Sequence, residues 1–565
     1  MRSFDADPSV TVEDSRGQRV HRRALEQSAR MVRRLYDVAP GVWTLVGNGL
    51  SNQTFIEGPE GVIAIDTGES NEEMASALAE LRTRTQAPMV AVMYTHFHYV
   101  NGTRAIFAEA GRDLPVYGHE RIPLNLARVS TEIAPAYSSG LIHQFGLRLP
   151  AEGPDGVVNM GLGLVFRDPS HAPFTPGHVT PTATFRGGET LTIAGLMVEV
   201  AHAPSDADDS VTFWFPALGV CVQNIVWPTL FNIFAIRGEE YRDPQVLLPG
   251  IDHVLSLEAE HLLGAHGPPL SGKAEIKART TRYRDSIQFL WDQTVRGMNK
   301  GQTTDHLAHS IVLPPACDDD YLTTEFYGVA EHHVRQIAAG VRGWFDGDPG
   351  GLFKVEPTER AGRMVAGFGG AETVRNLVDE ARTANDLRWA LELSSWLAAR
   401  AGATAGDRQL LADVLRDIAS RTTAANIRNW CLTRARDIDG STDLSRLREH
   451  RFRAGQLARL TPREALNLIR VTLDPAPAAG LDHHIGFHFS DAPAAGLHIR
   501  NSVSVATDGV GATSTLSMSY SDLTSVISGA STLAEALAAG AATIDGDAAA
   551  VRAALACFEI SGFRA

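Results

Sequence analysis

The sequence has few cysteines and fewer basic than acidic residues, and each shortage excludes a class of protein. Its four cysteines stand far apart in 565 residues and form no Cys-x-x-Cys pair. This spacing argues against a disulfide framework and against a structural zinc site. Lys and Arg number 51 against 66 Asp and Glu, a formal net charge of −15, which disfavours non-specific binding to nucleic acid or to an anionic membrane. A small anionic substrate stays compatible, because a local cationic pocket can form on an acidic protein.

Segments that would direct the chain into or across a membrane are also lacking. No run reaches about 18 apolar residues, the length at which a transmembrane helix is indicated. Residues 1–10 are polar and have no apolar core of the kind found in secretory signal peptides. The sequence therefore predicts a soluble cytoplasmic protein.

The texture of the chain changes twice along its length. Short strands and turns prevail up to about residue 280, long helical stretches with regular apolar spacing follow, and short alternating strands return near residue 460. Domains commonly hold roughly 100–200 residues, so about three are expected. We predict a mixed α/β domain over residues 1–280, an all-α helical domain over 281–440 and a small α+β domain over 441–565.

A histidine pair at the end of a predicted strand is the most informative feature of the first domain. The apolar run at residues 88–93 predicts a buried strand, and Tyr94-Thr95-His96-Phe97-His98 follows it directly. Side chains two positions apart on an extended chain point the same way, so His96 and His98 can hold one metal ion. A lone His-x-His pair is weak evidence, because many such pairs occur by chance on surfaces. The strand before the pair, and the Asn101-Gly102 turn and predicted helix after it, favour a metal site.

Two further candidates follow predicted strands. An acidic loop around Asp206 comes after strand-forming residues 190–200, and His266 ends a short predicted strand that begins at His261. Groups at strand ends are expected to meet at one edge of a layered α/β domain. Two histidines and one carboxylate with open positions form a recurring catalytic metal site. Zinc there would activate water or polarise an ester oxygen, whereas Fe(II) would form the facial triad of oxygen-using enzymes.

Several motifs, in the same order, resemble those of the metallo-β-lactamase-fold alkylsulfatases of the SDS-hydrolase type. In the first domain they lie at residues 50–58, 94–98, 153–157 and 232–238. Phe326-Tyr327-Gly328 and residues 343–347 resemble the family's dimerisation domain, and the last region resembles its sterol-carrier-like domain. The resemblance implies an αββα sandwich, then an all-α helical dimerisation domain, then an α+β sterol-carrier-like domain. It also implies a homodimer whose two-metal centre hydrolyses sulfate esters of fatty alcohols.

The family's first metal motif, Thr-His-x-His-x-Asp-His, is only half present. His96 and His98 match its first two histidines. Val100 stands at the aspartate position and Asn101 at the third histidine position. Valine cannot ligate a metal, and asparagine is a poor replacement for imidazole.

The later ligand positions are divided in the same way. The first glutamate ligand of the family falls at Asp206, with Asp208 or Asp209 as alternatives, and the second falls at Asn224. The late histidine matches His266. The resemblance thus leaves one divalent ion, zinc or iron, with the candidate ligands His96, His98, Asp206 and His266.

The positions that would handle a substrate are also mixed. Asn232 and Arg237 match the family's sulfate-binding pair, and arginine can hold an oxyanion through two parallel hydrogen bonds. The family's proposed general acid falls at Trp291. Tryptophan cannot donate a proton to a leaving group, although its ring could line a reshaped pocket.

Three functions fit these residues. The first is a divergent metal-dependent hydrolase that acts on a sulfate ester or similar anionic substrate through a mononuclear site, without ordinary two-zinc sulfatase chemistry. The second is a mononuclear non-haem iron enzyme of specialised metabolism. The third is a non-catalytic dimeric protein that binds an amphiphilic ligand. We favour the hydrolase because hydrolysis is the family's chemistry, and we expect a homodimer with no nucleic-acid partner and no membrane span.

Overall fold

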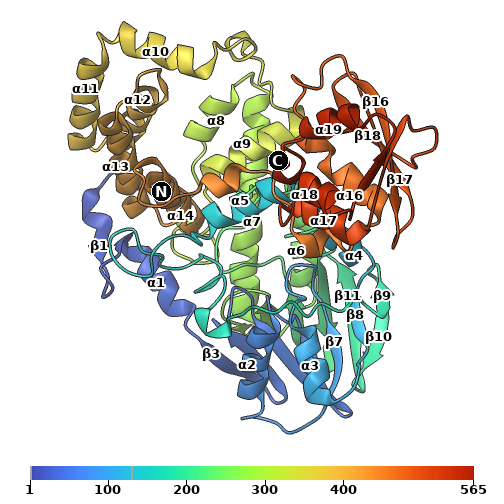
Figure 1. Ribbon diagram of the computed structural model, residues 1–565. Helices are drawn as coiled ribbons and strands as arrows, with labels where there is room; N and C mark the ends of the chain where they lie inside the picture. Colours follow the sequence, from blue (N-terminus) through green and yellow to red (C-terminus); the bar gives the residue numbers. More distant parts are fainter. Residues whose placement is uncertain (1–2, 129–130, 565) are drawn as a thin grey trace. The chain divides into compact units, whose positions relative to one another are not determined.

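The computed structural model describes residues 3–128 and 131–564 (Figure 1). The chain forms two compact units. The larger comprises the described residues up to Leu126 together with Gly140–Asp443, and the smaller comprises those of Ala127–Ser139 and Leu444–Ala565. The long helix α7 (Lys273–Met298) runs across residues 280 and 281, where the sequence predicts the first domain to end. The division into three domains stays a prediction.

Two sheets form the centre of the larger unit. The first has seven strands in chain order, antiparallel from β3 to β6 and parallel from β6 to β9. They are β3 (Arg34–Ala39), β4 (Val42–Val46), β5 (Gln53–Gly58), β6 (Gly61–Ile65), β7 (Met89–Met93), β8 (Val116–His119) and β9 (Ala183–Phe185). The second has six, of which only β13 and β14 pair in parallel. They are β10 (Thr190–Ile193), β11 (Leu196–His202), β12 (Val211–Phe215), β13 (Val220–Gln223), β14 (His261–Gly264) and β15 (Leu270–Ser271).

The sheets pack face to face through a buried apolar layer to which alternate residues of both contribute, among them Ile63, Met93, Val200 and Phe213. Helices α2 (Asn71–Leu81) and α3 (Thr103–Ala110) lie beside the outer face of the first sheet (Figure 1). On the outer face of the second sheet, Cys221 and Leu262 pack with side chains of α6 (Pro244–Ser256) and α7. The predicted αββα sandwich is confirmed.

The strand that carries the histidine pair forms as predicted. β7 has parallel neighbours on both sides and is buried on both faces, which explains its unbroken apolar sequence. At Gly102 the chain passes close to the segment that follows β6, and a Cβ there would lie 2.1 Å from the Thr67 carbonyl oxygen. Only glycine fits so close an approach.

Two local predictions are wrong in part. The sequence of residues 22–36 predicts one helix, but α1 spans only Arg22–Arg30 and residues from Arg34 pair with β4 as a strand. The strand predicted over residues 190–200 is a hairpin, because Ala194 and Gly195 both adopt positive φ and reverse the chain. In both segments a hairpin between strands that are neighbours in the sequence replaces part of the single element that was predicted.

Helices prevail after α7 in the larger unit. They are α8 (Thr304–Ser310), α9 (Ala330–Arg342), α10 (Pro357–Gly367), α11 (Ala371–Thr383), α12 (Leu387–Ala399), α13 (Ala405–Arg421) and α14 (Ala425–Ile438). Buried Val374, Leu393 and Ile418 belong to the core that joins α11, α12 and α13. The predicted all-α region is confirmed. Shorter elements elsewhere in the chain are β1 (Thr11–Glu13), β2 (Arg19–His21), α4 (Ile122–Arg128) and α5 (Ala134–Gln144).

The smaller unit has one five-stranded sheet in the order β18-β17-β16-β19-β20. Its strands are β16 (Asp482–Phe489), β17 (Ala495–Arg500), β18 (Val503–Thr507), β19 (Ser514–Met518) and β20 (Thr543–Asp545). Its helices include α15 (Ala454–Leu457), α16 (Pro462–Ile469), α17 (Tyr520–Ser528), α18 (Leu533–Ala538), α19 (Ala548–Ala556) and α20 (Ser561–Arg564). The predicted α+β class is confirmed. Across the described residues of the whole chain, no helix combines the length and the apolarity that a membrane crossing requires.

Candidate metal centre

His96, His98 and Asp206 lie together beyond the ends of β7 and β11. His96 Nε2 is 3.1 Å from His98 Nδ1 and 3.3 Å from Asp206 Oδ2, and His98 Nδ1 is 2.6 Å from the same oxygen. Ligand atoms about 2.0–2.2 Å from zinc are themselves about 3 Å apart, so these three atoms can share one ion with small adjustments. Within residues 3–128 and 131–564, no other group of three or more His, Cys, Asp or Glu side chains converges in this way.

His96 is held in the tautomer that a metal ligand requires. Its Nδ1 lies 2.9 Å from Thr95 Oγ1, and the Thr95 hydroxyl donates to Asp66 Oδ2 at 2.6 Å. Because the hydroxyl proton goes to Asp66, the Thr95 oxygen accepts from His96 Nδ1–H, and the Nε2 lone pair faces the cluster. Asp66 also accepts the Thr95 backbone N–H at 2.8 Å. The relay from Asp66 through Thr95 therefore orients the His96 ring.

His98 lies between two carboxylates. Its Nδ1 faces Asp206, and its Nε2 is 3.5 Å from Glu239 Oε1. Burial opposes the charged imidazole, but Asp206 and Glu239 outweigh it and raise the pKa of His98 to about 9. A proton would compete with a divalent ion for this imidazole, since only its neutral form ligates a metal.

Arg242, which no sequence motif singled out, fixes the carboxylate of the cluster. Its Nη2 lies 2.5 Å from Asp206 Oδ1, and its Nε donates to the Asp206 carbonyl oxygen at 3.1 Å. Its Nη1 donates to the Asn232 carbonyl oxygen at 2.8 Å. Despite burial, Arg242 and His98 hold the pKa of Asp206 well below its usual range. Asp206 is thus ionised, with Oδ1 on the arginine and Oδ2 toward the histidines.

The two alternative carboxylates of this loop have other environments. Asp208 accepts from Asn125 Nδ2 at 2.7 Å and pairs with Arg121 at 2.5 Å. Asp209 is fully buried, and burial raises its pKa to about 6. Neither of its oxygens has a hydrogen-bond partner among the residues that the structure describes. Asp206 alone of the three joins the histidine cluster.

His266, the fourth predicted ligand, lies outside the three-residue cluster. Its Nδ1 is 3.0 Å from the Leu50 carbonyl oxygen, to which it donates, and its Nε2 is 3.3 Å from the Tyr99 hydroxyl. The buried Tyr99 ring lies edge-on to the rings of His96 and His266, with centroids 5.1 and 5.3 Å apart. Burial lowers the pKa of His266 to about 4, so this imidazole is neutral. Both of its nitrogens are engaged by protein groups. Tyr99 lies inside the histidine motif, yet the motif gave no reason to select it.

The positions where the resemblance predicts lost ligands make structural contacts. Val100 is fully buried, and its backbone pairs with Gly68. The Asn101 backbone N–H donates to the Gly68 carbonyl oxygen at 3.0 Å. Asn224 Oδ1 accepts from Trp227 Nε1 at 3.2 Å. No carboxylate or imidazole is supplied by these three positions.

Arg237 and Asn232 lie on the loop between β13 and α6. An Arg237 guanidinium nitrogen, Nη2, contacts Glu239 Oε1 closely. Although burial opposes the charge, Arg237 and Arg242 lower the pKa of Glu239 to about 2, so this carboxylate is ionised. The Asn232 side-chain amide is buried, and in the described part of the chain it finds no hydrogen-bond partner for either polar atom. Glu239 was not predicted, because nothing in its local sequence separates it from Glu240.

Trp291 lies on α7, where its ring is partly buried against the apolar core that includes Tyr283 and Leu290. Its indole supplies no acidic proton to a leaving group. The prediction that its ring lines a substrate pocket stays a prediction.

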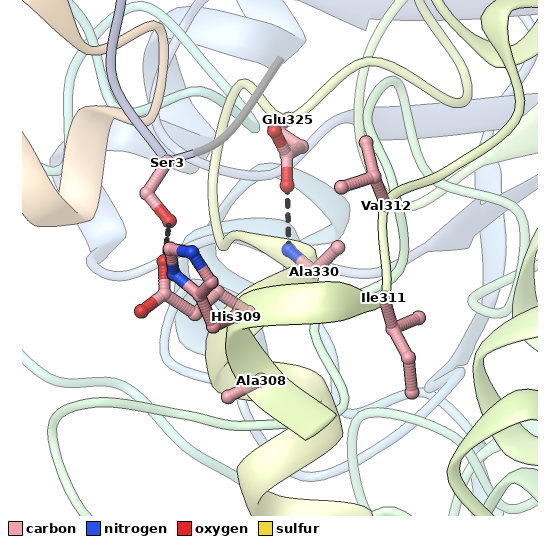
Figure 2. A pocket seen from close by; sticks show the side chains of 8 residues that line it. Ser3, Ala308, His309, Ile311, Val312, Glu325 and Ala330 are labelled. Carbon is pink, nitrogen blue, oxygen red and sulfur yellow. Dashed lines mark hydrogen bonds between the residues drawn. The ribbon is translucent and has the colours of Figure 1, made fainter. Parts of the chain in front are cut away.

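A small pocket elsewhere in the larger unit is structural. Figure 2 shows its lining residues, Ser3, Ala308, His309, Ile311, Val312, Glu325, Ala330 and Glu331. Glu325 Oε1 accepts from the Ala330 N–H at 2.6 Å at the start of α9, and Ser3 Oγ donates to Glu331 Oε2 at 2.7 Å. The first contact satisfies the Ala330 N–H in the first turn of the helix, and the second attaches Ser3 to the helix.

Known proteins share this architecture. Residues 303–441 match the family model for alkyl sulfatase dimerisation, and residues 453–563 match the one for the alkyl sulfatase C-terminal region. The chain is 32% identical over 523 residues to a linear primary-alkylsulfatase of Pseudomonas sp. (strain ATCC 19151), covering 89% of this chain and 98% of that protein. It is 27% identical over 475 residues to an (R)-specific secondary-alkylsulfatase of Pseudomonas sp., covering 81% and 70%. The solved structure of the stereoselective inverting sec-alkylsulfatase Pisa1 from Pseudomonas sp. matches with a TM-score of 0.79 at 25% identity, covering 94% of this chain and 86% of that one.

Proposed function

Because this chain belongs to the alkylsulfatase family of metallo-β-lactamase-superfamily enzymes, as its sequence motifs predicted, we propose that it hydrolyses a sulfate ester or similar anionic substrate with a single divalent metal ion. The class of substrate is supported by the family and by the buried Arg237 beside the cluster. The single ion departs from the two-metal centre that the resemblance implies, and it rests on the site itself.

One observation carries the one-metal proposal: the residues divide into a half that can hold a metal and a half that is closed. His96, His98 and Asp206 converge, and each has a partner that orients it. On the other side Val100 offers no ligand atom, and His266 is engaged at both nitrogens by Leu50 and Tyr99. A second ion would need ligands that this side does not supply.

The residues have separate tasks in the proposed reaction. His96, His98 and Asp206 would hold the ion, with the Asp66–Thr95 relay and Arg242 orienting them. A zinc ion held there would activate water near neutral pH and would polarise the ester. Arg237 and Asn232 would bind the anionic group of the substrate, since a guanidinium matches an oxyanion in shape and charge. Trp291 gives no proton, so the proposal assigns it no step.

A mononuclear non-haem iron enzyme is the second candidate. The same cluster favours it, because two histidines and one carboxylate with open positions are the ligand set of Fe(II) oxygenases. Oxygen consumption after anaerobic loading with Fe(II) separates this candidate from a zinc hydrolase, which consumes none.

We also propose that the chain acts as a homodimer through its helical region. Six large apolar side chains are exposed between residues 341 and 355, within the segment that matches the alkyl sulfatase dimerisation model. They are Val341, Trp344, Phe345, Leu352, Phe353 and Val355, here named the apolar loop. Trp344 is 75% exposed and Phe353 91%, which favours burial against a second copy.

Elemental analysis of the purified full-length protein, combined with sulfate release from a series of alkyl sulfates, tests the proposal. We expect about one equivalent of metal per chain and release of sulfate that is lost in His96→Ala. The exposed His306 provides a matched control, and His306→Ala should change neither quantity. Two equivalents of metal per chain would refute the one-metal centre. A protein that contains no metal and releases no sulfate would favour the non-catalytic dimer.

A further inference from the structure

The Glu239 carboxylate lies where the metal cluster meets the arginines. Oε1 contacts Arg237 Nη2 and is 3.5 Å from His98 Nε2, while Oε2 contacts Arg242 Nη2. One carboxylate therefore faces a candidate metal ligand and two guanidinium groups at once.

This arrangement is buried, which separates it from an ordinary surface ion pair. The exposed fractions of the side chains are 12% for Glu239, 8% for Arg237 and 4% for Arg242. Exposed pairs contribute little to stability because water competes for both partners. Charge-assisted contacts away from water are about twice as strong as neutral hydrogen bonds, so Glu239 holds these arginines firmly.

Arg242 does not depend on Glu239 for its position. It also binds Asp206 Oδ1 and the carbonyl oxygens of Asp206 and Asn232. Arg237 contacts the same Glu239 carboxylate through its Nη2. A carboxylate and a sulfate group offer a guanidinium the same pattern of paired anionic oxygens. Glu239 thus presents to Arg237 the chemistry that an anionic substrate would present.

We infer that Glu239 is a built-in competitor for the substrate's anionic group: a sulfate must displace its carboxylate from Arg237 before it can bind. The inference rests on the proposed function insofar as Arg237 is taken as the anion-binding residue. It makes Glu239 a determinant of specificity that weakens the binding of simple sulfate esters. A second anion beside Glu239 and Asp206 would otherwise add like charge to a buried site.

Calorimetric titration of the metal-loaded full-length protein with inorganic sulfate tests the inference. In Glu239→Gln, which keeps the size of the side chain and removes its charge, the dissociation constant for sulfate should fall by at least about tenfold. Glu239→Ala should bring a fall in the same direction and gives a second measurement if the glutamine variant is poorly folded. Glu240→Gln, on the exposed neighbour, is the matched control and should leave the constant unchanged.

Two outcomes would overturn the inference. If sulfate affinity stays the same or weakens in both Glu239 variants, the carboxylate positions Arg237 and does not compete with the anion. If their metal content falls as well, the change in sulfate affinity follows from the loss of the ion that Glu239 helps to hold through His98, and the competition is refuted. Adding Arg237→Met to Glu239→Gln should abolish the gain in affinity, and a gain that persists would place the anion elsewhere. Metal content and sulfate release of the wild type are measured separately, so a failure of the proposed function is recognised independently of these results.

Discussion

The Tyr99 hydroxyl lies 3.3 Å from His266 Nε2, the nitrogen through which this histidine would otherwise ligate a metal. His266 Nδ1 donates to the Leu50 carbonyl oxygen, so Nε2 carries the lone pair and accepts the hydroxyl proton. The Tyr99 side chain is buried against both His96 and His266. A tyrosine therefore satisfies the histidine that the family resemblance assigns to a metal.

Restoring the lost ligands tests whether Tyr99 closes the second half of the site. The triple variant Val100→Asp, Asn101→His and Asn224→Glu should still bind about one metal per chain, because Tyr99 continues to engage His266. Adding Tyr99→Ala should raise the content to about two, measured by elemental analysis after dialysis. Tyr99→Phe in the wild-type background, which removes only the hydroxyl, should stay at one. Two equivalents in the triple variant itself would show that Tyr99 is no obstacle.

A conservative substitution at Thr95 tests the relay that runs from Asp66 through Thr95 to His96. Thr95→Val keeps the shape of the side chain but removes the hydroxyl between Asp66 and His96 Nδ1. Metal affinity should fall roughly 10–100-fold, the usual cost of losing such an outer partner, measured by competition with a chelator. Thr95→Ser retains the hydroxyl and should restore most of the affinity. Equal losses in both variants would mean that the hydroxyl does not orient the ligand.

The parts of the site that follow from sequence are those with a local signal. His96 and His98 follow a continuous apolar strand, and Asp206 follows another strand, so their positions at the ends of predicted strands identified them as candidate ligands. Tyr99 and Arg242 have no such signal, because their roles depend on partners 167 and 36 residues away. The sandwich, the helical region and the final α+β region were predictable from periodicity and family motifs. The edge strand β3 was not, since its pairing with β4 overrides a helical pattern.

Metal binding should depend on pH through His98. Its pKa is raised to about 9, above the ordinary value of 6.5, by Asp206 and Glu239 against the effect of burial. Protons therefore compete with the metal below about pH 9, and metal affinity should rise as the pH increases from 6.5 to 9. Chelator competition at several pH values checks this. An affinity that is flat over this range would contradict the protonated imidazole.

The same shift has the opposite sign for the stability of the metal-free protein. A group whose pKa is higher in the folded state contributes stability that is complete below its unfolded pKa and is lost as the pH rises to the folded value. For His98 that window runs from 6.5 to about 9 and corresponds to up to about 3 kcal/mol. Glu73, whose pKa burial raises to about 8, acts in the same direction, because the folded state of an acid with a raised pKa loses stability once the pH exceeds the unfolded pKa. Both groups therefore lower the free energy of unfolding as the pH rises. Urea unfolding of the chelator-treated protein should show a falling free energy of unfolding across this window, with a smaller slope in His98→Gln.

The apolar loop should join two copies of the chain. In a twofold interface each substitution acts twice, and burying a large apolar side chain contributes about 1.5–3 kcal/mol. Trp344→Ser combined with Phe353→Ser should therefore raise the dissociation constant of the dimer by at least about 100-fold, measured by sedimentation over a range of concentrations. The melting temperature extrapolated to low concentration should hardly change, because both side chains are exposed on the single chain. Val510, which is 79% exposed in the smaller unit, provides the control Val510→Ser. If the wild-type protein is a monomer, or if the double variant dimerises as tightly as the wild type, the apolar loop is not part of a dimer interface. Aromatic rings that contact a second copy could not be replaced by serine without weakening the dimer.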